Sequence, residues 1–299
     1  MFGIMSLHST GVQEKDLAKK RKRQRQLDTA VAAIRHRYGS RALVKGKSAT
    51  AIDGVPHIPT GFSALDHALG IGGLPKGRVC ELVGPATSGK TTLALKFLAQ
   101  AQTCTPVQAC TPVQAGIGMP GHSAQVAYVD QALYFDPDYA HRCGLDLSRL
   151  LVGTSHDLRE ALAMTEALIH SGGLAAVVFD ALDFLWTDPE ATSLLAASLN
   201  RLPAALSHSG TTLLILHESA GDGASPPGRM PAGASPALSA LAHYAAVRLQ
   251  VAREEWLYHQ LDIRGYKARV KVLKNRWGPA GRAVTLSIEF NGTVRGNGL

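Results

Sequence analysis

Apolar and polar positions follow two different periods along this chain. Between residues 78 and 216, short continuous apolar runs are separated by segments in which apolar residues recur every three or four positions. The first pattern predicts buried strands and the second predicts helices that pack on one face. The expected strands are Arg78–Val83, Gln125–Asp130, Ala175–Phe179 and Thr211–Leu216. The helices expected between them are Thr91–Ala101, Asp157–His170 and Ala191–Leu206.

This order of elements predicts an α/β fold. Strands that alternate with helices form a mainly parallel sheet with helices on both faces. Each helix carries the chain back to the end of the sheet where the preceding strand began, so the next strand runs in the same direction. After residue 245 the period becomes two, as in residues 269–272 and 284–290. We therefore expect antiparallel strands at one edge of the sheet, with a turn at Asn291 and Gly292.

The first 50 residues have a different character. A basic run comprises Lys19, Lys20, Arg21, Lys22, Arg23 and Arg25. It precedes one helical stripe of apolar residues, namely Leu27, Val31, Ile34 and Tyr38. We divide the chain into a basic N-terminal arm and helix, residues 1–50, and a core, residues 51–299, that starts with a linker at 51–61. The arm is a solvated extension on a docking helix, a phosphate-binding surface or a spurious extension without a role.

The net charge of +8 is unevenly distributed. Residues 1–50 hold 12 Lys and Arg against 3 Asp and Glu, residues 51–250 hold 10 against 16, and residues 251–299 hold 9 against 4. A basic head and tail around an acidic middle indicate two local surfaces for polyanions or partners. Few cysteines and no apolar segment of the roughly 20 residues that a bilayer needs predict a cytoplasmic protein without membrane contact.

Two segments interrupt the pattern. Residues 103–122 contain the exact repeat CTPVQA twice and are interpreted as an inserted surface loop. Residues 221–236 are almost entirely Gly, Ala, Ser and Pro, with Arg229 as their one cation, and also predict a loop. Because the histidines and cysteines lack the spacings of zinc ligands, we predict no metal site of that kind.

The strongest chemical signal is GPATSGKT at residues 84–91, which fits the phosphate-loop pattern G-x-x-x-x-G-K-[ST]. An expected strand ends before it and an expected helix begins after it, so the loop's N–H groups would face an anion at a helix N-terminus. Lys90 would reach the β- and γ-phosphates, and the Thr91 hydroxyl would bind Mg²⁺. The predicted ATP-binding residues here are Gly84, Pro85, Ala86, Thr87, Ser88, Gly89, Lys90, Thr91 and Thr92.

A magnesium ion at such a loop also needs an acid at the end of a neighbouring buried strand. Asp180 directly follows the apolar run at residues 175–179 and is assigned this role, with Asp183 as a substitute. Thr91 and Asp180 are therefore the predicted metal residues, and ATP and Mg²⁺ are the predicted cofactors.

The sequence around this loop resembles the bacterial recombinase family RecA. The similarity begins in LDHALGIGGLPKGRV at residues 65–79 and continues in DPDYA at 136–140 and CGLD at 143–146. It extends through AAVRL at 245–249 and RVKVLKNR at 269–276. It covers about residues 25–295, which correspond to the family's N-terminal helix and ATPase core, and implies a RecA-like phosphate-loop fold.

The resemblance implies roles for residues outside the loop. Asp136 and Tyr139 would hold the adenine, Tyr139 by stacking on it. Lys274 and Arg276 would reach the γ-phosphate of ATP bound by the adjacent protomer of a filament. The N-terminal helix would dock onto a neighbouring subunit. The implied partners are a RecA-type recombinase, single-stranded DNA and further copies of this chain that assemble with ATP.

The departures from the family affect turnover and DNA binding. The family places a catalytic glutamate two residues after the aspartate that ends its second strand, whereas here Asp130 is followed by Gln131 and Ala132. No residue is therefore assigned as catalytic. Glu218 stands where the family has a glutamine that senses the γ-phosphate, and its charge would repel a phosphate. The two DNA-binding loops are shortened or replaced, and the resemblance does not reach the family's C-terminal domain.

A RecA core without this acid is similar to the ImuA-type RecA paralogues of bacterial mutagenesis cassettes, also at residues 145–152 and 171–178. That resemblance implies a partner of translesion polymerases and of RecA in the SOS response to DNA damage. Our first interpretation is an ATP-binding DNA-repair protein that modulates recombinase filaments or translesion synthesis with weak or no hydrolysis. The second is an active DNA-dependent ATPase recombinase. The third is a phosphate-loop protein outside DNA metabolism.

Overall fold

The computed structural model describes residues 8–38, 54–103, 124–181, 188–218 and 236–296. Contacts divide the chain into two units, residues 1–50 and 51–299. The first unit contains helix α1 (His8–Tyr38), which includes the whole basic run. The basic run is thus part of the helix. The described side chains from residue 21 to residue 30 are all exposed, including Leu27 of the predicted apolar stripe, which is 57% exposed.

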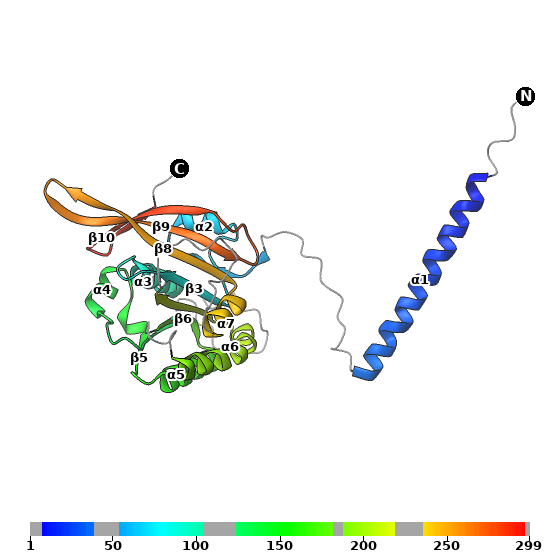
Figure 1. The fold of residues 1–299 in the computed structure, drawn as a ribbon, viewed down its shortest axis with the longest axis horizontal. Coiled ribbons are helices and arrows are strands. Elements are labelled where there is room, and N and C mark those ends of the chain that lie inside the picture. Colours follow the sequence, from blue (N-terminus) through cyan, green and yellow to red (C-terminus); the bar gives the residue numbers. More distant parts are fainter. Residues whose placement is uncertain (1–7, 39–53, 104–123, 182–187, 219–235, 297–299) are drawn as a thin grey trace, which may run out of the picture. The chain divides into compact units, whose positions relative to one another are not determined.

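A nine-stranded sheet organises the second unit, in the order β11-β10-β9-β8-β3-β7-β6-β4-β5 (Figure 1). The six strands from β8 to β5 are parallel, and β9, β10 and β11 are antiparallel. The parallel strands are β3 (Val79–Gly84), β4 (Gln125–Asp130), β5 (Leu150–Thr154), β6 (Leu174–Asp180), β7 (Thr212–Glu218) and β8 (Val247–His259). The antiparallel strands are β9 (Asp262–Asn275), β10 (Ala283–Glu289) and β11 (Val294–Gly296). The predicted parallel sheet with antiparallel edge strands is confirmed.

Helices cover both faces of this sheet (Figure 1). On one face, α2 (Ser63–Leu69) and α3 (Lys90–Thr103) contribute Leu65, Leu69, Leu95 and Phe97 to a core with β3, β4, β8, β9 and β10. On the other face, α5 (Leu158–Ser171), α6 (Pro189–Ser209) and α7 (Pro236–Tyr244) pack against β6 and β7. Each buried aliphatic or aromatic side chain contributes about 1.5–3 kcal/mol by leaving water, so the two cores fix the strand ends that carry the site.

Several elements were not predicted. Strand β5 forms the outer parallel edge, after a short 3-10 turn at Leu147–Arg149, and α4 (Pro137–Arg142) follows β4. The predicted linker at 51–61 is wrong in its described part, because β1 (His57–Ile58) pairs with β2 (Leu74–Pro75) and Ile58 is fully buried. The apolar Ile58 side chain places this segment in the core. Strands β8 and β9 form a long hairpin that extends beyond the helices (Figure 1).

Candidate nucleotide-binding site

The predicted phosphate loop connects β3 to α3. All residues of β3 are buried, and the strand ends at Gly84 where the loop begins. A Cβ atom at Gly84 would lie 2.1 Å from the carbonyl oxygen of Val251 on β8, so only glycine allows this close approach. Gly89 has a φ of +102°, which also requires glycine. The two glycines therefore let the chain turn sharply from strand to helix and leave its N–H groups at the N-terminus of α3.

The Lys90 ammonium group lies on the loop itself. Its Nζ atom donates hydrogen bonds to the carbonyl oxygens of Gly84 at 2.8 Å and Pro85 at 2.9 Å. The same Nζ atom is 3.8 Å from an oxygen of Glu218 at the end of β7. The structure thus places the predicted phosphate-binding lysine and the acidic residue at the predicted sensor position next to each other.

Hard oxygen ligands for a magnesium ion lie beside the loop. Asp180 ends β6 and is in register with Asp130, which ends β4. The Tyr128 hydroxyl donates a hydrogen bond to Asp180, and the Thr91 side chain lies next to the same hydroxyl. The two residues predicted to hold Mg²⁺ therefore share one neighbour. Asp130 Oδ1 is a buried acceptor without a hydrogen-bond partner among the described residues, and the water shell of a magnesium ion would supply donors.

The position of the missing glutamate contains no ionisable group. Ala132 is half-buried directly after β4. The neighbouring Asp130 is 1% exposed, and its Oδ2 atom accepts a hydrogen bond of 2.7 Å from the Phe135 backbone N–H. The Gln131 backbone N–H donates to the Asp180 carbonyl oxygen at 3.2 Å. These bonds hold the segment after β4 against β6, with the Ala132 methyl group at the position where the resemblance led us to expect an acid.

The two residues expected to hold an adenine have partners within the fold. Asp136 caps α4 by accepting a 3.0 Å hydrogen bond from the Tyr139 backbone N–H. The Tyr139 hydroxyl is 2.7 Å from the Thr92 hydroxyl, which ties α4 to α3 beside the phosphate loop. Burial raises the pKa of Tyr139 to about 12, so the phenol stays neutral. The Arg142 guanidinium lies 5.5 Å from the centre of the Tyr139 ring, which shows that this ring already receives a planar cation.

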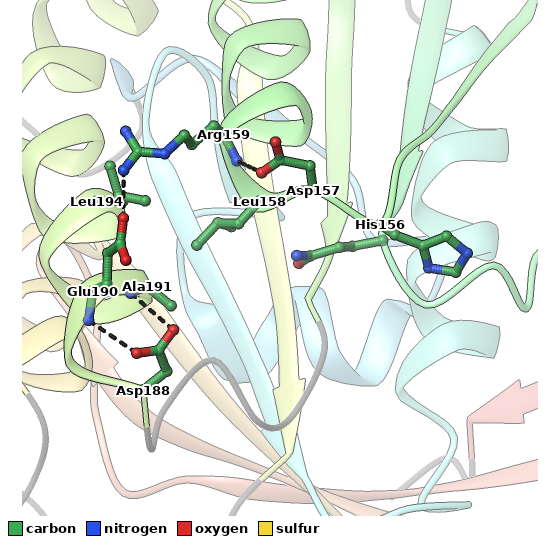
Figure 2. A pocket seen from close by; sticks show the side chains of 9 residues that line it. His156, Asp157, Leu158, Arg159, Asp188, Glu190, Ala191 and Leu194 are labelled. Atoms are coloured by element: carbon green, nitrogen blue, oxygen red, sulfur yellow. Dashed lines mark hydrogen bonds and ion pairs between the residues drawn. The ribbon is translucent and has the colours of Figure 1, made fainter.

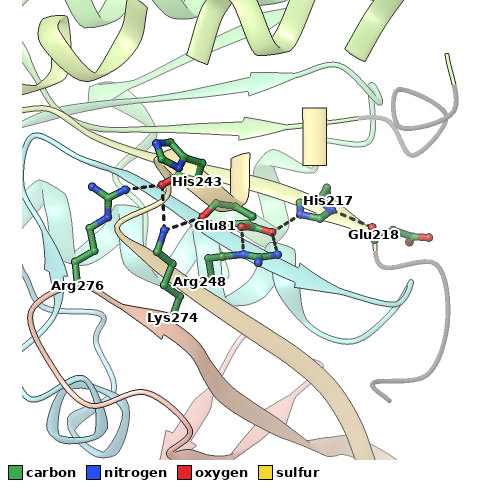
Figure 3. Close-up of polar contacts among 8 residues, drawn as sticks. Glu81, His217, Glu218, His243, Arg248, Lys274 and Arg276 are labelled. Atoms are coloured by element: carbon green, nitrogen blue, oxygen red, sulfur yellow. Dashed lines mark hydrogen bonds and ion pairs between the residues drawn. The ribbon is translucent and has the colours of Figure 1, made fainter. Parts of the chain in front are cut away.

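The two cations predicted to serve a neighbouring protomer contact the end of α7 (Figure 3). Lys274 Nζ donates to the carbonyl oxygens of Ala242 at 2.7 Å and His243 at 3.0 Å, and Arg276 also bonds the His243 carbonyl. Cations are favourable at a helix C-terminus because unpaired carbonyl groups gather there. Burial and the charges of Arg276 and Arg248 lower the pKa of Lys274.

A buried ionic cluster beneath the loop was not found from the sequence. Glu81 in β3 is paired with Arg248 in β8, and its carboxylate also lies 2.7 Å from His217 Nε2 in β7 (Figure 3). His217 directly precedes Glu218, so the cluster supports the strand end that faces Lys90. The available signal was a glutamate inside the apolar run at residues 79–83, since buried carboxylates are almost always paired.

A pocket of about 240 Å³ lies near the carboxyl end of β4 (Figure 2). Its lining consists of Gln131, His156, Asp157, Leu158, Arg159, Asp188, Glu190, Ala191 and Leu194. The carboxylates of Asp157 and Asp188 cap α5 and α6, and Arg159 pairs with Glu190. Arg159 and Glu190 pair with each other and the two aspartates accept from backbone N–H groups, so we assign no ligand to the pocket.

Several predicted features lie outside the described residues. They are the repeat-containing segment from residue 104, most of the Gly/Ala/Ser/Pro segment up to residue 235, and the substitute acid Asp183. Within the described parts of the chain, no helix is both long and apolar enough to cross a membrane.

The fold and the loop define a phosphate-loop nucleotide-binding protein, and the donor set of Lys90, Thr91 and Asp180 fits a nucleotide with Mg²⁺. The family model for the RecA N-terminal domain matches residues 25–295. The chain is 34% identical over 291 residues to Protein RecA of Frankia alni, covering 92% of this chain and 77% of that one. It is 33% identical over 293 residues to Protein RecA of Streptomyces ambofaciens, covering 93% and 72%.

The chain belongs to the RecA family, which confirms the resemblance seen in the sequence. Its fold is similar to that in the crystal structure of the RadB recombinase, with a TM-score of 0.57 and 18% identity over 81% of this chain and 100% of that one. Membership in this family supports ATP binding and a role in DNA repair and recombination.

Proposed function

We propose that this protein binds Mg·ATP and modulates recombinase filaments or a translesion polymerase complex in bacterial DNA repair, with little ATP turnover. The observation that carries the proposal is a complete phosphate loop beside Ala132, where the family's acid is missing. The first half of that observation favours nucleotide binding, and the second disfavours hydrolysis. Family membership argues against the interpretation as a phosphate-loop protein outside DNA metabolism.

Hydrolysis requires a base that takes a proton from the attacking water. The Ala132 methyl group cannot accept a proton. Two nearby carboxylates already accept hydrogen bonds within the fold: Asp130 accepts from the Phe135 backbone N–H, and Asp180 accepts from the Tyr128 hydroxyl. Loss of a general base typically costs about 10²–10⁴-fold in rate. Turnover at least tenfold below that of a complete RecA is therefore expected.

The experiment measures ATP binding and ATP turnover separately, with and without single-stranded DNA. Wild type should bind Mg·ATP, and Lys90→Ala should abolish binding because it removes the cation that faces the phosphates. Ala132→Glu should raise the turnover number toward the family's level without tightening binding. Leu133→Glu is the matched control, since it adds the same charge one residue later on an exposed side chain.

Three outcomes would contradict the proposal. Rapid DNA-stimulated hydrolysis by wild type would remove the claim of little turnover. Failure of wild type to bind ATP with magnesium would remove the nucleotide site altogether. Equal stimulation by Ala132→Glu and Leu133→Glu would show that position 132 has no special place in the chemistry.

The second candidate function, an active DNA-dependent ATPase, is favoured by the position of Glu218. Its carboxylate lies 3.8 Å from Lys90 Nζ and is about one-third exposed, so it is a carboxylate on the phosphate side of the loop. If Glu218 replaces the missing acid, Glu218→Gln should abolish turnover while ATP binding persists. If it does not, the same variant should bind ATP more tightly, because one negative charge next to the phosphates is lost.

A further inference from the structure

A cation from outside the phosphate-loop motif contacts the crest of the loop. Arg253 Nη1 donates a hydrogen bond to Thr87 Oγ1 at 3.2 Å. Strand β8 pairs with β3 as far as Gln250 opposite Val83, so Arg253 lies on the part of β8 that continues past the strand end. Thr87 has a φ of +56°, in the left-handed region. The contact therefore joins the exposed turn of the loop to the base of the β8–β9 hairpin.

An aromatic cluster holds the guanidinium group in place. The Cζ atom of Arg253 lies 4.3 Å from the ring centre of Trp256, within cation–π range. Trp256 packs edge-on against Tyr266 at 6.0 Å and against Phe290 at 6.4 Å between ring centres. Tyr266 in turn abuts the loop, since a Cβ atom at Gly89 would lie 2.9 Å from its hydroxyl oxygen. Arg253 thus contacts the phosphate loop at Thr87, and the aromatic cluster contacts it at Gly89.

Two carboxylates near the loop weaken its attraction for a polyphosphate, and Arg253 would offset their charge. Lys90 Nζ faces the Glu218 carboxylate at 3.8 Å, and the Asp180 carboxylate accepts a hydrogen bond from Tyr128, which lies beside Thr91. Each carboxylate offsets part of the attraction between the loop and a polyphosphate. A guanidinium has five N–H donors in one plane, so one edge can hold Thr87 while the other faces an anion.

We propose that Arg253 binds the terminal phosphate of a nucleoside triphosphate held by its own protomer, and that Trp256 is its positioning residue. This inference rests on the proposed nucleotide site. It assigns Arg253 to the same protomer's ligand, in contrast to Lys274 and Arg276, whose predicted target is the neighbour's nucleotide. The protein's preference for a nucleoside triphosphate over a diphosphate would then depend on the Arg253 guanidinium, which the Trp256 ring holds in place.

The test is calorimetric titration of the full chain with the non-hydrolysable β,γ-imido analogue of ATP and with ADP, each with Mg²⁺. Arg253→Ala should weaken binding of the triphosphate about tenfold and of ADP less than about threefold, because charge-assisted hydrogen bonds to the last phosphate are lost. Arg253→Lys keeps the charge but loses the planar fork, so its triphosphate affinity should be intermediate. Trp256→Ala should weaken triphosphate binding about threefold, and Trp256→Phe should restore it.

The matched control is Arg264→Ala, which removes an exposed cation from the same hairpin and should leave both affinities unchanged. The inference would be overturned if Arg253→Ala lost equal affinity for the triphosphate and for ADP. It would also be overturned if neither variant of Arg253 lost affinity for the triphosphate. In both cases the proposed nucleotide site would remain. A wild type that binds neither nucleotide would overturn both. Thermal melts of each variant identify unfolding, and Arg253→Lys, the smaller change, then decides the outcome.

Discussion

The Tyr128 hydroxyl in the middle of β4 donates a hydrogen bond to the carboxylate of Asp180 at the end of β6. Tyr128 is 1% exposed, and its ring packs 5.0 Å from Phe135. Burial, followed by the negative charge of Asp180, raises the pKa of Tyr128 well above its ordinary value. The phenol therefore remains protonated and donates its one proton to Asp180, with the Thr91 side chain beside it.

We predict that Tyr128→Phe weakens the magnesium dependence of nucleotide binding. The carboxylate that would bind the ion loses the donor that orients it, and comparable supporting residues typically change metal affinity about 10–100-fold. Magnesium titration of nucleotide binding should show a half-saturation at least tenfold higher, whereas binding measured in excess chelator should not change.

The control for this prediction is Tyr134→Phe, which removes a hydroxyl from a side chain that is 85% exposed. It should leave the magnesium titration unchanged. If Tyr128→Phe shifts binding equally with and without magnesium, the hydroxyl serves folding and not the metal residues.

A second prediction concerns the pH dependence contributed by Glu81. Burial alone would raise the pKa of its carboxyl group, but the hydrogen bond and charge of His217 and those of Arg248 hold the pKa below its ordinary value of 4.5. A carboxyl whose pKa is lower in the folded state stabilises the fold above its unfolded pKa, and this stability is lost as pH falls through the folded value.

Glu81→Gln should therefore reduce the free energy of unfolding at pH 7 by about 3 kcal/mol, because it leaves Arg248 without its buried partner. The difference between variant and wild type should shrink below about pH 4.5. Urea denaturation from pH 7 to pH 4 measures it. Glu255→Gln, which breaks an exposed pair with Lys267, is the control and should cost less than about 1 kcal/mol. A constant difference across this pH range would refute the lowered pKa.

A third prediction assigns DNA affinity to helix α1. Arg21, Lys22, Arg23 and Arg25 have exposed side chains on this helix. Replacing all four by Gln keeps helix propensity but removes phosphate contacts. Each lost contact should reduce the slope of log affinity against log salt by about 0.7 for a single strand. Fluorescence anisotropy with labelled single-stranded DNA measures the slope. An unchanged slope would assign DNA binding, if present, to other surfaces.

The sequence predicted the elements that have a clear period and missed those that do not. Strand β5 is an edge strand in which Leu151 and Val152 remain exposed and Gly153 interrupts the run, so it shows neither a buried run nor an alternation. The outer part of β8, from Arg253 to Tyr258, is mostly exposed, which removes the period of two. Alternation was visible in the inner part of β8, at residues 247–252, and in β9 and β10, each with a buried face.

At the candidate site, the sequence predicted the residues of the contiguous phosphate-loop motif but not the contacts between residues far apart in the chain. The phosphate loop is contiguous, so its residues could be named from the sequence. Glu81 and Arg248 are 167 residues apart, and Arg253 and Thr87 are 166 apart. Both contacts form because β8 lies beside β3 in the sheet. The order of strands in a sheet could not be predicted from this single sequence, so neither contact was predicted.

The last prediction concerns Lys274 and Arg276, whose place at the end of α7 gives them a structural use within one protomer. If they also reach a γ-phosphate of an adjacent protomer, they must exchange the carbonyl groups of Ala242 and His243 for the phosphate. That exchange is favourable because a phosphate carries a full negative charge and a helix terminus about half of one. Assembly should therefore depend on ATP.

Sedimentation of the wild type should show association with ATP and less with ADP. Lys274→Ala with Arg276→Ala should reduce association at least tenfold in protein concentration, while the isolated protomer still binds ATP, because these cations serve the neighbour's site. Mixing the variant with the cell's RecA tests the hetero-association in the same way. Lys271→Ala, three residues earlier on β9, is the control for lost charge. Association that is indifferent to nucleotide and to both substitutions would leave the two cations with their role at α7 alone.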